Sequence, residues 1–92
     1  MKRCVRITVS GKVQNVSYRA FAQKKAQALS IEGTIQNTDN GSVLIYACGP
    51  SEKLDTLIDY LYEGTPESQI KELTVEPFIN EKDFRGVFRI IG

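Results

Sequence analysis

Residues 4–29 of this chain read CVRITVSGKVQNVSYRAFAQKKAQAL, and the spacing of their apolar side chains changes part-way along. Val5, Ile7 and Val9 alternate with polar residues, which is the period of a strand with one buried face. Farther on, apolar residues recur at the spacing of a helix, at Tyr18, Phe21, Ala22, Ala26 and Leu29. The stretch therefore predicts a strand from about Cys4 to Ser10, a short polar loop, and a helix from about Tyr18 to Leu29.

The loop between this strand and this helix ends with an arginine in the first helical turn. It spans residues 11–19, GKVQNVSYR. The first backbone N–H groups of a helix have no internal partner, and the helix dipole places partial positive charge there. Arg19 adds a planar set of donors that suits a phosphate or a carboxylate. The loop thus predicts an anion site. Taken alone, it is equally consistent with Gly11 and Asn15 only turning the chain and Arg19 being an ordinary surface cation.

The rest of the chain continues the alternation of strands and helices. Further strands are predicted at 30–37, 42–48, 70–78 and 84–91, with a hairpin turn at Asp39-Asn40-Gly41. Gly49-Pro50 ends the third strand and opens a second helix, whose apolar stripe is Leu54, Leu57, Ile58 and Leu61. This order predicts one α+β domain over residues 1–92. The expected fold is a ferredoxin-like split βαβ sandwich, with two helices on one face of an antiparallel sheet and a short extra C-terminal strand.

Composition limits the functions that this chain can have. Twelve basic and eleven acidic residues give a net charge of +1, which disfavours nucleic acid as a partner because general binding needs a strong basic surplus. There is no histidine and no C-x-x-C pair, so no metal site is expected. Cys4 and Cys48 are expected to be buried free thiols rather than a disulfide. No segment has the apolar length of a signal peptide or a transmembrane helix, so a cytoplasmic monomer without a membrane partner is expected.

A second polar segment follows the second predicted strand. Residues 33–43 read GTIQNTDNGSV, and taken alone they form a hairpin in which Asn37 caps its own turn. In the predicted topology, however, the loop after the first strand and the second strand can come together, which would let Asn37 face Arg19. A neutral amide beside an arginine can hold a water without being repelled by a bound anion. These parts would suffice for phosphoryl transfer to water.

Both segments resemble the signature motifs of the acylphosphatase family. The family pattern G-x-V-Q-G-V-x-F/Y-R is matched by residues 11–19 except at Asn15, where the family usually has glycine. The pattern G-x-A/V-x-N-x-x-D/N-G-x-V is matched closely by residues 33–43. Gly49-Pro50 before a leucine-rich helix and the late G-x-F-x-I at residues 86–90 are also similar to the family. The resemblance covers essentially the whole chain.

The resemblance implies an activity and a set of site residues. The family hydrolyses carboxyl–phosphate mixed anhydrides such as acetyl phosphate, so the expected partner is a small-molecule acyl phosphate, with no cofactor. By this resemblance Arg19 binds the substrate phosphate and Asn37 orients the attacking water. The phosphate is also expected to contact backbone N–H groups of the loop formed by Gln14, Asn15, Val16, Ser17, Tyr18 and Arg19. Because a carboxylate is a good leaving group, positioning and charge stabilisation suffice for catalysis.

The chain departs from the family pattern at two positions, Asn15 and Thr34. If position 15 requires a positive φ, asparagine is the residue that tolerates it best after glycine, at a cost of about 1 kcal/mol. Thr34, where the family often has an aromatic residue, is expected to affect packing.

One alternative function is that of a catalytically weak module that binds a phosphate-bearing ligand or partner. An RNA-recognition domain is disfavoured, because the two central strands offer Arg6, Thr8, Leu44 and Tyr46 and no aromatic pair for stacking bases.

Overall fold

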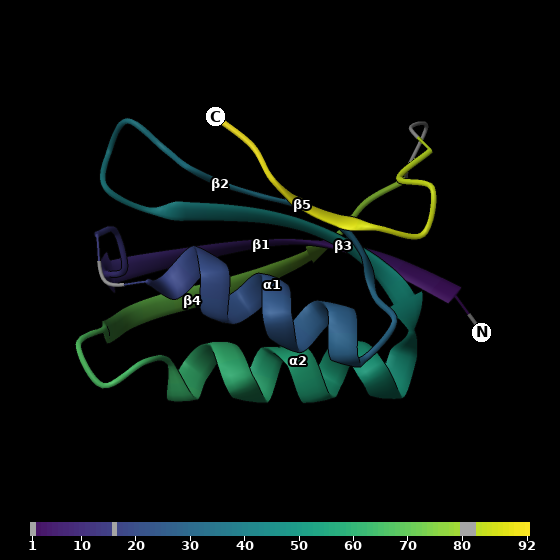
Figure 1. Ribbon diagram of the computed structural model, residues 1–92, viewed down its shortest axis with the longest axis horizontal. Coiled ribbons are helices and arrows are strands. Elements are labelled where there is room, and N and C mark those ends of the chain that lie inside the picture. The colour runs from purple at the N-terminus through teal and green to yellow at the C-terminus, as the bar shows by residue number, and fades with distance from the viewer. Residues whose placement is uncertain (1, 16, 80–82) are drawn as a thin grey trace.

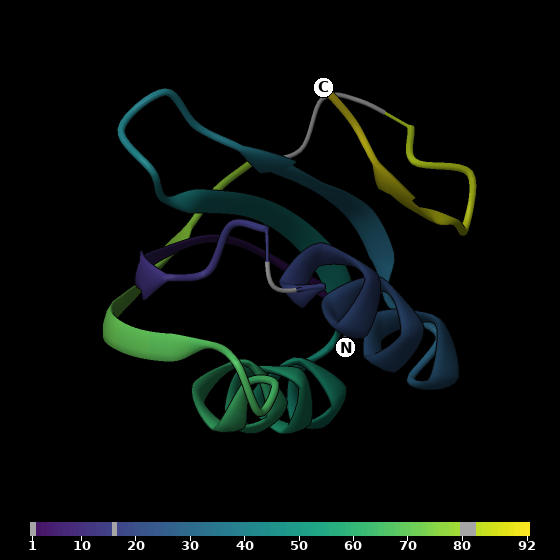
Figure 2. The ribbon, with the colours of Figure 1, turned by 60° about the vertical axis from the view of Figure 1, so that its left-hand side comes forward.

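The chain folds into a sheet with helices packed on one of its faces (Figures 1 and 2). The computed structural model describes residues 2–15, 17–79 and 83–92, and these form two helices and five strands. The elements in chain order are β1 (Lys2–Lys12), α1 (Tyr18–Ala28), β2 (Glu32–Asn37), β3 (Val43–Pro50), α2 (Ser51–Glu63), β4 (Gln69–Pro77) and β5 (Phe88–Ile90). This is the predicted ferredoxin-like α+β architecture, which is confirmed.

The sheet has the strand order β4-β1-β3-β2-β5. The pairs β4–β1, β1–β3 and β3–β2 are antiparallel, as predicted, whereas β5 runs parallel to β2. The predicted extra strand therefore exists, but it covers only Phe88–Ile90 and makes the sheet mixed. The direction of β5 follows from the segment that connects it to β4. The chain leaves β4 at one edge of the sheet, and residues 84–87 form a turn before β5 pairs with β2 on the other side of the sheet.

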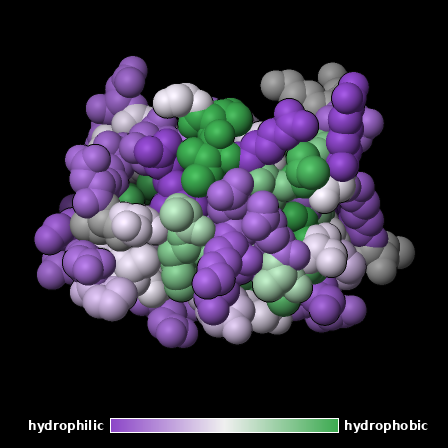
Figure 3. Space-filling view, in the orientation of Figure 1, coloured by the Kyte–Doolittle hydropathy of each residue, from purple (hydrophilic) through white to green (hydrophobic). Residues whose placement is uncertain are grey.

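The core lies between the sheet and the helices. Alternate residues of the central strands point toward the helices and are fully buried, as are the stripe of α2 and the small residues of α1: Val5, Ile7, Val9, Ile35, Val43, Ile45, Ala47, Ala22, Ala26, Leu54, Leu57 and Leu61. Burying one Val, Leu or Ile side chain stabilises a fold by about 1.5–3 kcal/mol. Seen from outside, the helix-bearing face is mostly hydrophilic, with a hydrophobic cluster beside the C-terminal end of the chain (Figure 3).

Two glycines make close backbone approaches that no other residue would allow. At Gly33, with φ of 151°, a Cβ atom would lie 1.8 Å from the carbonyl oxygen of Tyr46 in β3. At Gly11, with φ of 122°, it would lie 2.1 Å from the carbonyl oxygen of Gln69 in β4. Gly11 also sits where the register between β1 and β4 shifts, so it forms a bulge. This bulge bends the end of β1 just before the loop that leads to α1.

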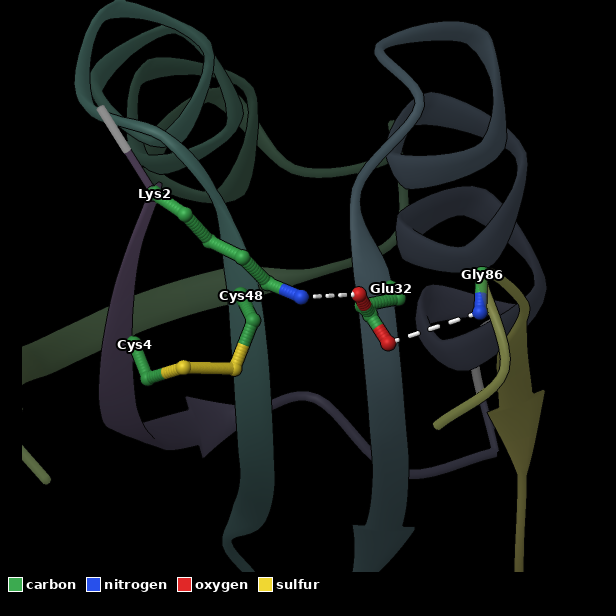
Figure 4. Close-up of a disulfide and its surroundings, with 5 residues drawn as sticks. All are labelled: Lys2, Cys4, Glu32, Cys48 and Gly86. Carbon is green, nitrogen blue, oxygen red and sulfur yellow. Dashed lines mark hydrogen bonds and ion pairs between the residues drawn. A yellow bond between two sulfur atoms is a disulfide. The ribbon is translucent and has the colours of Figure 1, made fainter. Parts of the chain in front are cut away.

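The expectation of free thiols at Cys4 and Cys48 is wrong. The two residues lie directly opposite each other in the β1–β3 ladder and form a disulfide, with a Cα–Cα distance of 4.1 Å (Figure 4). Their separation of 44 residues gave no sign of this, because the pairing register depends on how the distant strands align. Next to the disulfide, Lys2 forms an ion pair with Glu32, which also accepts a hydrogen bond from the backbone N–H of Gly86 (Figure 4).

The disulfide is expected to stabilise the fold mainly by restricting the unfolded chain. Replacing both cysteines (Cys4→Ala with Cys48→Ala) should lower the free energy of unfolding by roughly 2–4 kcal/mol, because the lost crosslink closes a long loop. Urea denaturation followed by circular dichroism measures this. The wild-type protein in excess reducing agent serves as the control and should approach the stability of the double variant. Equal stability of the oxidised wild type and the double variant would show that the crosslink contributes nothing.

Candidate active site

The loop after β1 and the turn between β2 and β3 lie at the same end of the sheet (Figures 1 and 2). Gln14 joins them directly. Its side-chain Nε2 donates hydrogen bonds to the backbone carbonyl oxygens of Thr38, at 3.0 Å, and Ser42, at 2.9 Å. The turn is closed by its own hydrogen bond from the N–H of Thr38 to the carbonyl of Ser42. The two segments that the sequence analysis singled out are therefore held together by a half-buried amide.

The loop takes up left-handed backbone conformations at two positions. Asn15 has φ of 60° and Ser17 has φ of 59°. Position 15 thus requires the positive φ for which the family pattern uses glycine, and asparagine tolerates this conformation better than most residues. Val16, which was also predicted to belong to the phosphate-binding loop, lies outside the described residues.

The start of α1 is not capped by its own residues. Ser17 occupies the N-cap position without a side-chain capping hydrogen bond, and the first turn carries no acidic residue. The first N–H groups of the helix also lack intrahelical carbonyl partners, and the dipole makes this end partially positive. Such an end of a helix attracts an anion.

A small pocket of about 180 Å³ opens at this helix start. It is lined by Val13, Asn15, Ser17, Tyr18, Arg19, Ala20 and Ile90. None of these described lining residues is acidic. Pockets that hold drug-sized ligands are larger, with volumes of about 300–1,000 Å³, so this pocket suits a small molecule.

Arg19 and Tyr18 are neighbours in sequence with different roles. Arg19 is half-buried at the pocket and, within the part of the chain that the structure describes, forms no ion pair and no side-chain hydrogen bond. Its guanidinium is therefore available to a ligand. Tyr18 is buried, and its hydroxyl donates a hydrogen bond of 2.8 Å to the carbonyl of Leu61, which anchors α1 to α2. Burial raises the pKa of Tyr18 above its usual value, so the phenol stays neutral.

Asn37 ends β2 with its side chain on the helix-covered face, because side chains alternate along a strand and the preceding Ile35 is fully buried there. Its Oδ1 atom is buried and accepts no hydrogen bond from the residues that the structure describes. Asn37 is not among the described residues that line the pocket, and the structure shows no hydrogen bond between it and Arg19. Its place near the loop follows from its neighbour Thr38, which Gln14 contacts.

Two contributions to this region were missing from the sequence analysis. Gln14 was predicted only through its backbone, whereas its side chain makes the tie to the turn. Ile90 was not predicted at all as part of the pocket. The alternation of Phe88 and Ile90 in the late G-x-F-x-I motif did carry a signal, because it places both side chains on the face of β5 that looks toward α1.

Comparison with known proteins shows which family the chain belongs to. The family model described as "Acylphosphatase" matches residues 5–90. The chain belongs to the acylphosphatase family. An acylphosphatase from Coxiella burnetii (strain RSA 493 / Nine Mile phase I) is 37% identical over 84 residues, covering 89% of this chain and 88% of the relative. An acylphosphatase from Caldivirga maquilingensis is 36% identical over 83 residues, covering 89% and 87%.

Solved structures agree with this family. A Coxiella burnetii acylphosphatase superposes with a TM-score of 0.89 at 33% identity, covering 98% of this chain and 93% of that chain. The Bacillus subtilis acylphosphatase superposes with a TM-score of 0.88 at 30% identity, with full coverage of both chains. A likeness to 12% of full-length HypF, at 24% identity, concerns the fold alone. The predicted membership of the acylphosphatase family, a family of hydrolytic enzymes, is thus confirmed.

Two properties of the described residues bear on other functions. No group of three or more histidine, cysteine, aspartate or glutamate side chains in the described part of the chain is placed to hold a metal ion. Neither α1 nor α2, the helices of the described residues, is long and apolar enough to cross a membrane.

Proposed function

We propose that this chain hydrolyses the carboxyl–phosphate bond of small acyl phosphates, giving a carboxylate and inorganic phosphate, by in-line attack of a positioned water. The observation that carries the proposal is the unpaired guanidinium of Arg19 at an uncapped helix start in one small pocket. Membership of the acylphosphatase family and the names of the relatives support it.

In this mechanism the phosphate lies against the loop of residues 14–19. Arg19 contacts two of its oxygens, and backbone N–H groups at the start of α1 contact the others. In the transition state negative charge is spread over the three equatorial oxygens. Donors that are fixed in place before the reaction stabilise this charge without reorganising. Gln14 contributes by fixing the loop to the β2–β3 turn through its two hydrogen bonds.

Asn37 holds the attacking water in this proposal. A buried acceptor that lacks a partner costs about 1–3 kcal/mol, and a hydrogen bond donated by a water to Oδ1 would relieve that cost. The water then keeps a lone pair free to attack phosphorus. An amide suits this task because, unlike a carboxylate, it does not repel the negatively charged substrate. The hydrogen bond from Gln14 to Thr38, the residue after Asn37, would hold the attacking water and the bound phosphate in fixed positions relative to each other.

The leaving group needs no proton donor. A departing carboxylate has a pKa near 4, so it leaves as an anion at neutral pH. Tyr18, which lies at the pocket, is held in a hydrogen bond to Leu61 and is not assigned a role in proton transfer. The chain has no histidine to serve as a general acid or base.

The alternative function is that of a catalytically weak binding module. The reason for considering it was Asn15, which stands where the family pattern has glycine. The φ of 60° at Asn15 is one that asparagine adopts, so this departure leaves the loop conformation intact. The acylphosphatase relatives do not favour this alternative.

We also propose that the protein acts as a monomer in the cytoplasm and without nucleic acid. A reducing cytosol would keep Cys4 and Cys48 as thiols, so the location bears on the disulfide.

Turnover of acetyl phosphate tests the proposal directly. The protein should release inorganic phosphate from acetyl phosphate in the presence of EDTA, and added inorganic phosphate should inhibit competitively because it occupies the same loop. The measurement is a colorimetric assay of released phosphate with a matched blank for spontaneous hydrolysis. Activity that disappears with EDTA and returns with magnesium would contradict the mechanism.

Arg19 and Asn37 should be separable by their kinetic effects. Arg19→Ala should lower kcat/KM by ~10³-fold or more and weaken inhibition by phosphate, because the guanidinium contacts the phosphate before and during the reaction. Asn37→Ala should lower kcat by about 10²–10³-fold and leave inhibition by phosphate nearly unchanged, because the amide contacts only the water.

Matched controls exist for both variants. Arg89→Ala removes an exposed arginine of β5, and Gln36→Ala removes an amide next to Asn37 whose side chain lies on the uncovered face of the sheet. Both controls should retain wild-type kinetics. Near-normal turnover by Asn37→Ala would remove that residue from the mechanism, whereas unchanged phosphate inhibition in Arg19→Ala would remove the arginine from the binding site.

The pH–rate profile should show no enzyme ionisation between about pH 6 and 8, because histidine is the side chain that normally titrates there. In the oxidised protein used for this measurement Cys4 and Cys48 are joined in the disulfide and do not titrate, and the raised pKa of Tyr18 keeps its phenol neutral. Any acid-side inflection should follow the ionisation of the substrate and move when the acyl group is changed. A bell-shaped profile centred near neutrality and identical for several acyl phosphates would indicate a general base of the enzyme.

A further inference from the structure

The pocket at the start of α1 has one wall that comes from the far end of the chain. Ile90, in the last strand β5, faces the loop and the helix that carry the polar groups. It pairs with Ile35 of β2 and retains 39% exposure. Together with Val13 and Ala20 it supplies aliphatic side chains to the lining of a pocket that also contains Arg19.

Hydrogen bonds hold β5, the strand that carries Ile90, to its neighbours α1 and β2. The side-chain Nε2 of Gln23 in α1 donates a hydrogen bond of 2.9 Å to the carbonyl of Phe88, which ties β5 to the helix. The N–H of Ile91 donates one of 2.9 Å to the carbonyl of Ile35, which ties β5 to β2. Phe88 itself is buried in the core. Ile90 is therefore held at the pocket from both sides.

The polar and the apolar lining residues of the pocket suit different parts of an acyl phosphate. The phosphate needs charge and hydrogen-bond donors, which Arg19 and the helix start offer, and it gains nothing from an apolar wall. An uncharged acyl substituent gains by leaving water for such a wall. The volume of about 180 Å³ leaves room for a short aliphatic group or a single ring rather than a long chain.

Resting on the proposed function, we infer that Ile90, with Ala20 and Val13, contacts the acyl substituent and makes the enzyme prefer acyl phosphates that carry a compact apolar group. The role assigned to Ile90 is one of specificity. It touches the part of the substrate that differs between acyl phosphates and not the phosphate that they share.

The test compares benzoyl phosphate with acetyl phosphate. The kcat/KM for benzoyl phosphate divided by that for acetyl phosphate should fall about 5- to 10-fold in Ile90→Ala and roughly 2-fold in Ile90→Val. Each lost methyl or methylene contact weakens the discrimination between the two acyl groups. Ile90→Val keeps a β-branched side chain in β5 and guards against loss of folding in the alanine variant. Ile91→Ala is the matched control, because Ile91 has the same exposure of 39% but lies away from this pocket, and it should keep the wild-type ratio.

The outcomes separate the inference from the proposed function. A graded fall in the ratio, with an unchanged inhibition constant for inorganic phosphate, would support the specificity role. An unchanged ratio in folded Ile90 variants that still hydrolyse both substrates would overturn it and leave the proposed function standing. Failure of the wild-type protein to hydrolyse either substrate would overturn both.

Discussion

The antiparallel pairing of β1 with β3 is the constraint on which the rest of the structure depends. Their buried faces coincide, since Val5, Ile7 and Val9 lie opposite Ala47, Ile45 and Val43. A slip of one residue would turn all of these side chains toward solvent, so the register is strongly specified. The same register places the end of β1 beside the beginning of β3. The loop after β1 and the turn before β3 must therefore meet, and Gln14 joins them.

Sequence periodicity was sufficient to predict most of the fold, because one face of each central strand and one stripe of each helix are apolar. It could not give the direction of β5, which depends on a connection that crosses from one sheet edge to the other. Nor could it give the disulfide, since whether Cys4 meets Cys48 depends on strand alignment across the sheet. The positive φ at Asn15 was considered only as a condition in the sequence analysis, because the family pattern has glycine at this position.

The candidate site divides in the same way between local and distant signals. Arg19 could be predicted because its position in the first turn of a helix is a local property of the chain. Ile90 could not be assigned to the pocket in this manner, because it reaches the pocket only through the pairing of β5 with β2. Asn37 lies between these cases. The motif identified it and the topology brought the end of β2 to the loop, but its Oδ1 has no hydrogen-bond partner among the described residues and it is not among the described residues that line the pocket.

The disulfide and the proposed phosphate-binding loop lie toward opposite ends of the same pair of strands. Cys4 is five positions before Val9 in β1, which at about 3.4 Å per residue corresponds to roughly 17 Å. Between them lie the fully buried pairs of the sheet, which hold the ladder together without the crosslink. We therefore expect opening of the sulfur bridge to change the stability of the folded molecule more than the rate of the proposed hydrolysis. Substitutions at the two ends of this strand pair would then affect stability and turnover separately.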